Sequence, residues 1–199
     1  MRESNDTHLK AACGQPESSP RIASPPEEAA LAYRIGDWES FALAHVGASA
    51  ALLGLVFVVI SINLRDIVGS GPLVHRAAEA VVLLGGVLAV ATVVLIPGQR
   101  KDVLSTELIL LAVALFATVL FLQRDAVTQA VDPGRPAPPR ASLSIRRVFG
   151  LGTAVLVGIT GVTLAAGAGG GLYWLPAAIL AAYGGSLTNA WILIIEILR

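Results

Sequence analysis

The chain has 199 residues, of which 55% are hydrophobic and 14% are charged, and its 14 basic and 14 acidic residues balance to a formal charge of zero. Globular proteins carry about 25% charged residues, so this composition indicates an integral membrane protein surrounded by the lipid bilayer. The balanced charge excludes the basic surface expected of a nucleic-acid partner. A single cysteine, Cys13, excludes an intramolecular disulfide framework and a Cys-x-x-Cys metal or redox site.

The N-terminal part of the chain predicts a tail followed by a membrane anchor. Residues 1–36 are polar and rich in Pro, Ser and Glu, a composition typical of a disordered tail. The first apolar run follows at 38–64, with Asp37 as its candidate N-cap. This run is too long and too far from the start for a cleaved signal peptide, so we expect a retained transmembrane helix.

Later apolar runs predict four more transmembrane helices. Runs at 73–96 and 103–122 are separated by a short charged link. The stretch from Val148 to Ile195 contains no Asp, Glu, Lys, Arg or His, and it is long enough for two spans of about 20 residues each. We therefore expect spans at 148–166 and 176–198, joined by a glycine-rich connection, and a flexible Pro-rich loop at 124–147. The fold class is an all-α bundle of about five transmembrane helices over residues 37–199.

The distribution of Lys and Arg predicts the orientation of the bundle. With five spans, the N-terminal side carries six of these residues and the opposite side carries eight. Without Arg2 and Lys10, which lie far from the membrane, the ratio is four to eight. The positive-inside rule then favours an external N-terminus and a cytoplasmic C-terminus in the cell membrane.

Small residues recur every four positions in the last two predicted spans. The rows that we single out are Ala177, Ala181 and Gly185 in the fifth span and Gly150, Ala154 and Gly158 in the fourth. Such rows let helix backbones approach closely in lipid. They fit packing between these two helices, with an interface in a homo-oligomer as the alternative.

The first span carries polar residues near one face. His45 and Asn63 are separated by five helical turns, and Ser49 lies one turn after His45. Polar groups in a span normally face the interior of the bundle. This face indicates either interhelical hydrogen bonds or a polar pathway in which His45 titrates.

Four further polar residues in the other spans are candidates for a functional site. They are Glu79, Glu107, Asn189 and Glu196. Glu107 lies near a helix start, where the helix dipole favours an anion, and Glu196 can reach the interface with water. Ionisable residues at membrane depth are functional candidates in general, although all three glutamates lie close to a helix end.

Motifs of enzyme active sites are not found in the sequence. It contains no His-Glu-x-x-His, no Walker loop and no nucleophile elbow. We therefore expect a non-enzymatic protein with no catalytic residue, cofactor or metal site.

Several segments carry a resemblance to other membrane proteins. They are 47–64 (GASAALLGLVFVVISINL), 76–79 (RAAE), 171–174 (GLYW) and 190–196 (AWILIIE). Together they resemble a group of small polytopic bacterial integral membrane proteins that has no assigned activity. The resemblance covers about residues 38–199, and it implies a helical membrane fold without assigning a role to any residue.

Two functional hypotheses follow from the sequence. The first is an interaction or regulatory membrane protein that binds itself or another membrane protein through small-residue helix faces, and it predicts a dry bundle. The second is a small oligomeric channel or carrier along the polar face of the first span, and it predicts a wet cavity there. We prefer the first, because no deep charge or broken helix marks a transport route.

Overall fold

The computed structural model describes residues 30–69, 71–129 and 140–197. Almost all of these residues are helical, and none of them lies in a strand. The elements are η1 (Ile35–Trp38), α2 (Glu39–Ile62), α3 (Leu64–Gly69), α4 (Gly71–Val94), α5 (Lys101–Gln129), α6 (Arg140–Ala166), η2 (Gly171–Tyr173) and α7 (Trp174–Ile197). The predicted all-α bundle is confirmed.

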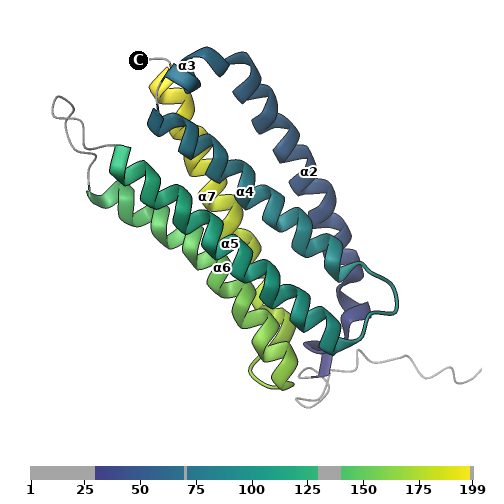
Figure 1. Ribbon diagram of the computed structural model, residues 1–199. Helices are drawn as coiled ribbons and strands as arrows, with labels where there is room; N and C mark the ends of the chain where they lie inside the picture. The colour runs from purple at the N-terminus through teal and green to yellow at the C-terminus, as the bar shows by residue number, and fades with distance from the viewer. Residues whose placement is uncertain (1–29, 70, 130–139, 198–199) are drawn as a thin grey trace, which may run out of the picture.

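Within the described residues, five segments are long and apolar enough to cross a membrane, as the sequence predicted. They are Ile35–Ile62, Leu73–Val94, Lys101–Arg124, Ser144–Ala166 and Gly171–Ile195. Successive long helices run antiparallel (Figure 1), so their connections alternate between two ends of the bundle. We call the end with α3, the end of α5 and the start of α6 the loop end. The opposite end, with the link after α4 and the turn between α6 and η2, is the glycine end.

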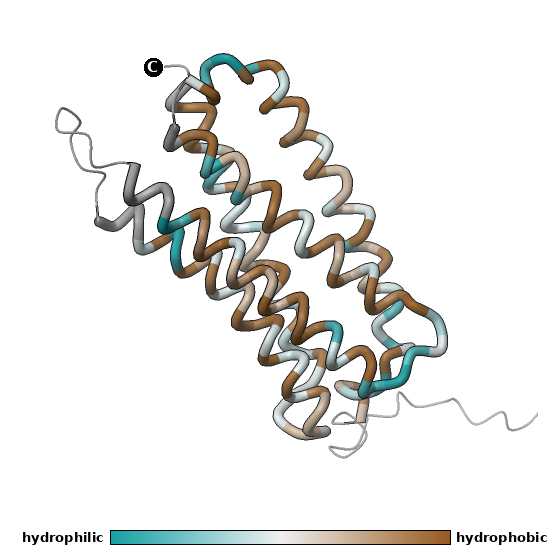
Figure 2. Tube along the Cα trace, viewed as in Figure 1, coloured by the Kyte–Doolittle hydropathy of each residue, from teal (hydrophilic) through white to brown (hydrophobic). Residues whose placement is uncertain are grey.

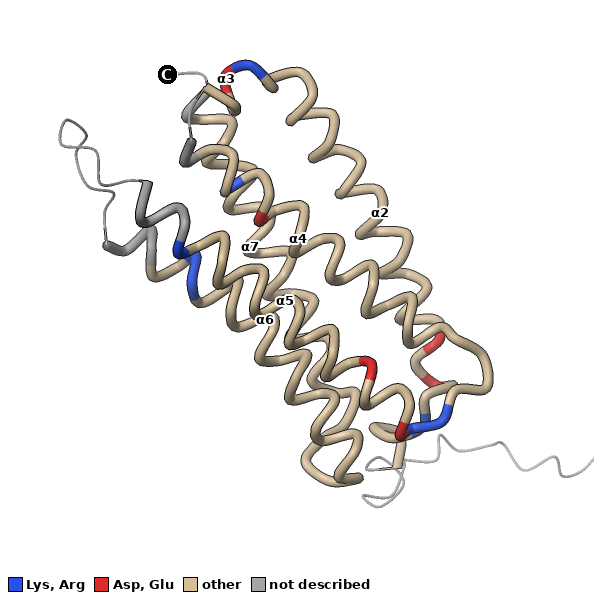
Figure 3. Tube along the Cα trace, viewed as in Figure 1, with Lys and Arg blue, Asp and Glu red and all other residues tan. Residues whose placement is uncertain are grey.

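The polarity of the bundle matches a bilayer. Apolar residues dominate the middle of the long helices (Figure 2), and charged residues gather toward the two ends (Figure 3). A helix of about 20 residues spans the 30 Å hydrocarbon core, so this distribution of charge is compatible with helices whose ends lie at the two membrane surfaces.

The helices form a four-helix unit with one helix beside it. Helix α4 packs against α5 and α7, and α6 packs against the same two helices from the other side. Helix α2 packs mainly against α4. Only 6% of the most apolar stretch of α2 is buried, compared with 28% to 56% in the other four spans. Helix α2 therefore lies at the edge of the bundle, as Figure 1 also shows.

The first long helix differs at both ends from the predicted run 38–64. Asp37 is not its N-cap, because Asp37 lies in η1 and forms an ion pair with Arg34 (3.5 Å). Helix α2 begins at Glu39 without a side-chain cap and ends at Ile62. Asn63 follows, and its Nδ2 donates to the backbone oxygen of Val59 (2.9 Å). This bond marks the break between α2 and α3.

The predicted loop at 124–147 is too long. Helix α5 continues to Gln129 and α6 begins at Arg140, so both flanks of the predicted loop are helical. The prolines of this region, which disrupt helices, are confined to positions 133–139. The residues on both sides of these prolines are polar, but they can still form helix. Helices α5 and α6 therefore extend past their apolar spans. Residues 130–139 themselves lie outside the described residues.

The predicted disordered tail at 1–36 also ends too late. Ala32 is only 2% exposed, and its backbone oxygen accepts a hydrogen bond from the backbone nitrogen of Leu172 (3.0 Å). The hydroxyl of Tyr33 accepts another from the backbone nitrogen of Gly170 (3.1 Å). This apolar segment thus binds the glycine-rich turn. Residues 1–29 lie outside the described residues.

Candidate functional site

The candidate site is a buried polar network centred on Glu79 of α4, which is 1% exposed. Arg146 of α6 forms an ion pair with it, and the Arg146 Nε donates to Glu79 Oε2. Gln123 of α5 donates from Nε2 to Glu79 Oε1 (2.8 Å). Arg146 and Gln123 are 9% and 5% exposed. One carboxylate therefore connects three transmembrane helices near the loop end.

Topology explains how these three residues meet. Glu79 lies near the start of α4, Gln123 near the end of the α5 span and Arg146 near the start of the α6 span. Because consecutive helices are antiparallel, these three positions lie at the same depth and the same end of the bundle. The apolar surroundings then favour direct pairing, since an unpaired charge at this depth would be costly.

Gly150 leaves the space that the network occupies. It follows Arg146 by one helical turn and lies on the same face of α6. A Cβ atom at Gly150 would lie 2.8 Å from both Gln123 Nε2 and Glu79 Oε1. Gly150 is the first residue of the predicted small-residue row in the fourth span. Its missing side chain makes room for the side chains of Gln123 and Glu79 and not for the backbone of another helix.

The hydrogen bonding of the network is almost complete. Gln123 Nε2 also lies 3.3 Å from the backbone oxygen of Arg146, which accepts a second bond. Gln123 Oε1 and Arg146 Nη2 are buried and have no partner among the described side chains. Both oxygens of the Glu79 carboxylate accept bonds from the protein, so the arrangement fixes three helices in one register.

The polar residues of the first span do not form one site. His45 Nδ1 lies 3.2 Å from the hydroxyl of Tyr183 on α7 and forms a hydrogen bond with it. The His45 ring also contacts Phe41, at 4.4 Å between ring centroids. Ser49 donates to the backbone oxygen of His45 (2.6 Å). The side chain of Asn63 bonds to Val59 at the end of α2, so the structure separates it from His45.

The remaining predicted polar residues are scattered over the bundle. Glu107 lies at the glycine end and accepts a hydrogen bond from Gln99 in the link before α5. Asn189 is buried in α7. The side chain of Glu196 lies outside the described residues. Within the described part of the chain, no group of three or more His, Cys, Asp and Glu residues could hold a metal ion.

Most of the predicted small-residue positions pack within the chain. A Cβ at Gly185 would lie 2.9 Å from Leu83 of α4 and 3.0 Å from Phe149 of α6. Gly158 faces Ala112 of α5 at 3.5 Å. Ala154 of α6 is buried too. By contrast, Ala177 is exposed and Ala181 is half-buried.

Sequence reasoning missed Gln123 and Arg146. Arg146 falls within the region that was predicted to be a loop, and Gln123 lies at a predicted span end. A usable signal was nevertheless present, because a glutamate inside an apolar helix requires a partner at the same depth. Antiparallel topology limits the candidates to the end of the third span and the start of the fourth.

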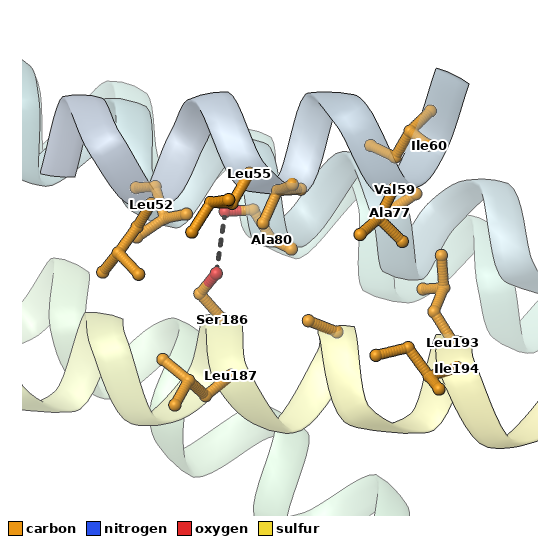
Figure 4. A pocket seen from close by; sticks show the side chains of 13 residues that line it. Leu52, Leu55, Val59, Ile60, Ala77, Ala80, Ser186, Leu187, Leu193 and Ile194 are labelled. Atoms are coloured by element: carbon orange, nitrogen blue, oxygen red, sulfur yellow. Dashed lines mark hydrogen bonds between the residues drawn. The ribbon is translucent and has the colours of Figure 1, made fainter. Parts of the chain in front are cut away.

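An apolar groove lies on the opposite side of α4 from this network. It has a volume of about 180 Å³ and separates α2 from α7, with α4 as its floor. Figure 4 shows side chains of α2 and α7 pointing into it. Ser186 is the only residue with a polar side chain in its lining, so the groove is suited to hydrocarbon and not to water.

The fold and these two features define a class, an all-α multi-pass membrane protein with a buried ion pair inside its bundle. Comparison of the chain with protein-family models, with curated proteins and with solved structures finds no match.

Proposed function

We propose that this protein is a non-enzymatic interaction or regulatory protein of the bacterial cell membrane, and that it binds a partner through the outer face of α2. The observation that carries this proposal is the low burial of α2, 6% in its most apolar stretch. Helix association in lipid depends on close packing. A span with one packed side has the remaining surface available for another membrane protein or for a second copy of this chain.

The residues on the outer face of α2 support close contact with another helix. Gly47, Ala51 and Gly54 are exposed and lie within one narrow arc of the helix. No atom of the described residues lies within 4 Å of a Cβ atom at Gly47 or Gly54. Glycine inside a helix costs about 0.5–1 kcal/mol relative to alanine, and close approach of a second backbone offsets this cost in membrane helices.

The channel or carrier alternative has weaker support. Its polar face would need solvent-accessible groups along α2, whereas His45, Ser49 and Asn63 each form a hydrogen bond within the chain. The groove beside α2 is apolar. Neither feature favours a hydrated route for an ion or a polar substrate.

The charges of the described residues support the predicted orientation. The loop end carries Arg65, Arg76, Arg124, Arg140, Arg146 and Arg147 against Asp66, Glu79, Asp125 and Glu196, whereas the glycine end carries Arg34, Arg100 and Lys101 against Asp37, Glu39, Asp102 and Glu107. The positive-inside rule therefore favours a cytoplasmic loop end. We therefore include a cytoplasmic loop end in the proposal.

Cysteine crosslinking in native membranes tests the proposed face. In a Cys13→Ser background, Gly47→Cys should give one crosslinked species of defined mass, whose identity as a dimer or a heteromeric complex is read by mass spectrometry. Adding Gly54→Leu should abolish that species, because the larger side chain separates the helices. The matched control is Gly152→Leu on α6, where likewise nothing lies within 4 Å of the added Cβ. No crosslink at position 47, or equal loss in the control, contradicts the proposal.

A further inference from the structure

The groove between α2 and α7 lies away from the outer face of α2 and has its own chemistry. Its buried floor includes Ala80 and Leu84, each 1% exposed, whereas Leu55 and Leu187 at its mouth are 63% and 57% exposed. The hydroxyl of Ser186 donates to the backbone oxygen of Ala80 (3.3 Å), as Figure 4 shows. No polar group of the lining is left to bind water.

The volume of the groove limits the size of the ligand that can bind in it. An apolar cavity of about 150 Å³ stays dry and holds a molecule the size of benzene, whereas pockets for drug-sized ligands occupy about 300–1,000 Å³. At about 180 Å³, this groove fits a short segment of hydrocarbon chain.

The length of the groove distinguishes a lipid chain from a partner helix. Its lining on α2 runs from Leu52 to Ile60, which is about 12 Å at 1.5 Å per residue. A helix lying along the groove would extend across the whole hydrocarbon core of about 30 Å, whereas one leaflet contributes about 15 Å. The groove therefore matches one leaflet.

Contacts between helices mark both ends of the groove, whereas its mouth at Leu55 and Leu187 is open to the surrounding lipid. Toward the glycine end, the hydrogen bond between His45 and Tyr183 joins α2 to α7. Toward the loop end, Ile60 packs on the cluster that contains Ala77 and Leu193. Beyond Ile60, α3 presents the exposed side chain of Arg65.

We propose that this groove binds one acyl chain of an anionic phospholipid, with its phosphate beside Arg65 at the loop end. Helix α2 ends at Ile62, about 15 Å along its axis from Leu52, and Arg65 follows in α3 just beyond this end. Half of a bilayer with its headgroups is about 20–22 Å thick. The net positive charge of the described residues at the loop end complements an anionic headgroup.

Photocrosslinking in nanodiscs tests the position of the lipid. Phosphatidylglycerol with a diazirine in one acyl chain should label peptides of α2 and α7 that contain the groove residues 52–60 and 187–194. Phosphatidylcholine with the same chains should label them about fivefold less, which is the effect of one arginine near anionic lipid. Arg65→Gln should remove this difference. Equal labelling by the two lipids, or labelling spread evenly over all five spans, overturns the proposal.

Filling the groove provides the second test, with retained lipid measured by native mass spectrometry. Ala190 lines the groove, so Ala190→Leu should abolish the retained phosphatidylglycerol. Ala117→Leu is the matched control, because Ala117 is exposed on α5. Equal retention by the two variants overturns the proposal. Loss of an oligomer with lipid retention unchanged also overturns it and assigns the groove to a second copy.

Discussion

Replacing Arg146 by methionine should strongly destabilise the bundle. The substitution removes the cation that pairs with Glu79, and Glu79 is 1% exposed. Breaking a buried ion pair by removing one partner costs about 3–5 kcal/mol, because a charge is left buried without compensation. Gln123→Leu removes only one neutral donor from the carboxylate, so the expected cost is about 0.6–1.7 kcal/mol.

The double variant separates the contribution of the pair from the cost of breaking it. Glu79→Leu combined with Arg146→Met replaces both charges by apolar groups of similar volume. Such replacements are often neutral or stabilising, so the double variant should unfold at least as late as the parent and well after either single variant. The measurement is reversible unfolding in mixed micelles followed by circular dichroism, with Arg147→Met as the exposed control, expected within about 0.5 kcal/mol of the parent.

Two results would refute this reasoning. If Arg146→Met lowers the free energy of unfolding by less than about 1 kcal/mol, the pair is not buried as the fold indicates. If the double variant loses as much as the two single variants together, the charges contribute independently and the network does not act as a unit.

Three further predictions concern single contacts. Gly150→Ala should lower the free energy of unfolding by about 1–3 kcal/mol, because its Cβ would lie 2.8 Å from two atoms of the network. The control Gly152→Ala should be neutral or stabilise the protein by up to about 1 kcal/mol. Equal melting temperatures of the two variants contradict this prediction. Gly171→Ala should loosen the contact with the N-terminal segment, since its φ is +50° and its Cβ would lie 2.5 Å from the backbone oxygen of Ala32. Limited proteolysis should then cleave that segment faster. An unchanged rate of cleavage counts against this prediction. Tyr183→Phe should cost about 0.6 kcal/mol through loss of the bond to His45, and a loss above about 2 kcal/mol in micellar unfolding would exceed what one such bond explains.

The existence and order of the five spans could be predicted because the bilayer imposes a length. A helix that crosses 30 Å of hydrocarbon needs about 20 apolar residues, and each such run is visible in the sequence. Helix ends in water carry no such constraint. Hydropathy therefore placed Gln129 and Arg140 in a loop, although both belong to helices. Hydropathy also placed Tyr33 in the disordered tail, because one short apolar segment does not change the polar character of the region. In the structure, this segment binds a turn that is distant in the sequence.

The candidate site could be predicted only in part, because periodicity gives the face of a helix but not its neighbour. His45 and Asn63 share a face by spacing, yet one bonds to Tyr183 and the other to its own helix. Glu79 was identified as a candidate, but its partner Arg146 lies 67 residues away in the sequence. Such a pairing becomes visible only when the antiparallel order of the helices is used to compare depths.

The two proposals predict a coupling between lipid and partner, because both act on α2. The buried network joins α4, α5 and α6, so α2 can shift without breaking it. A lipid chain in the groove would set the spacing between α2 and α7, and a partner on the outer face would act on the same helix. Coupling between two ligands is reciprocal. The association measured by crosslinking at position 47 should therefore be stronger in nanodiscs of phosphatidylglycerol than of phosphatidylcholine. Ala190→Leu, which fills the groove, should remove this difference, and a difference that persists in this variant would show that the lipid acts elsewhere.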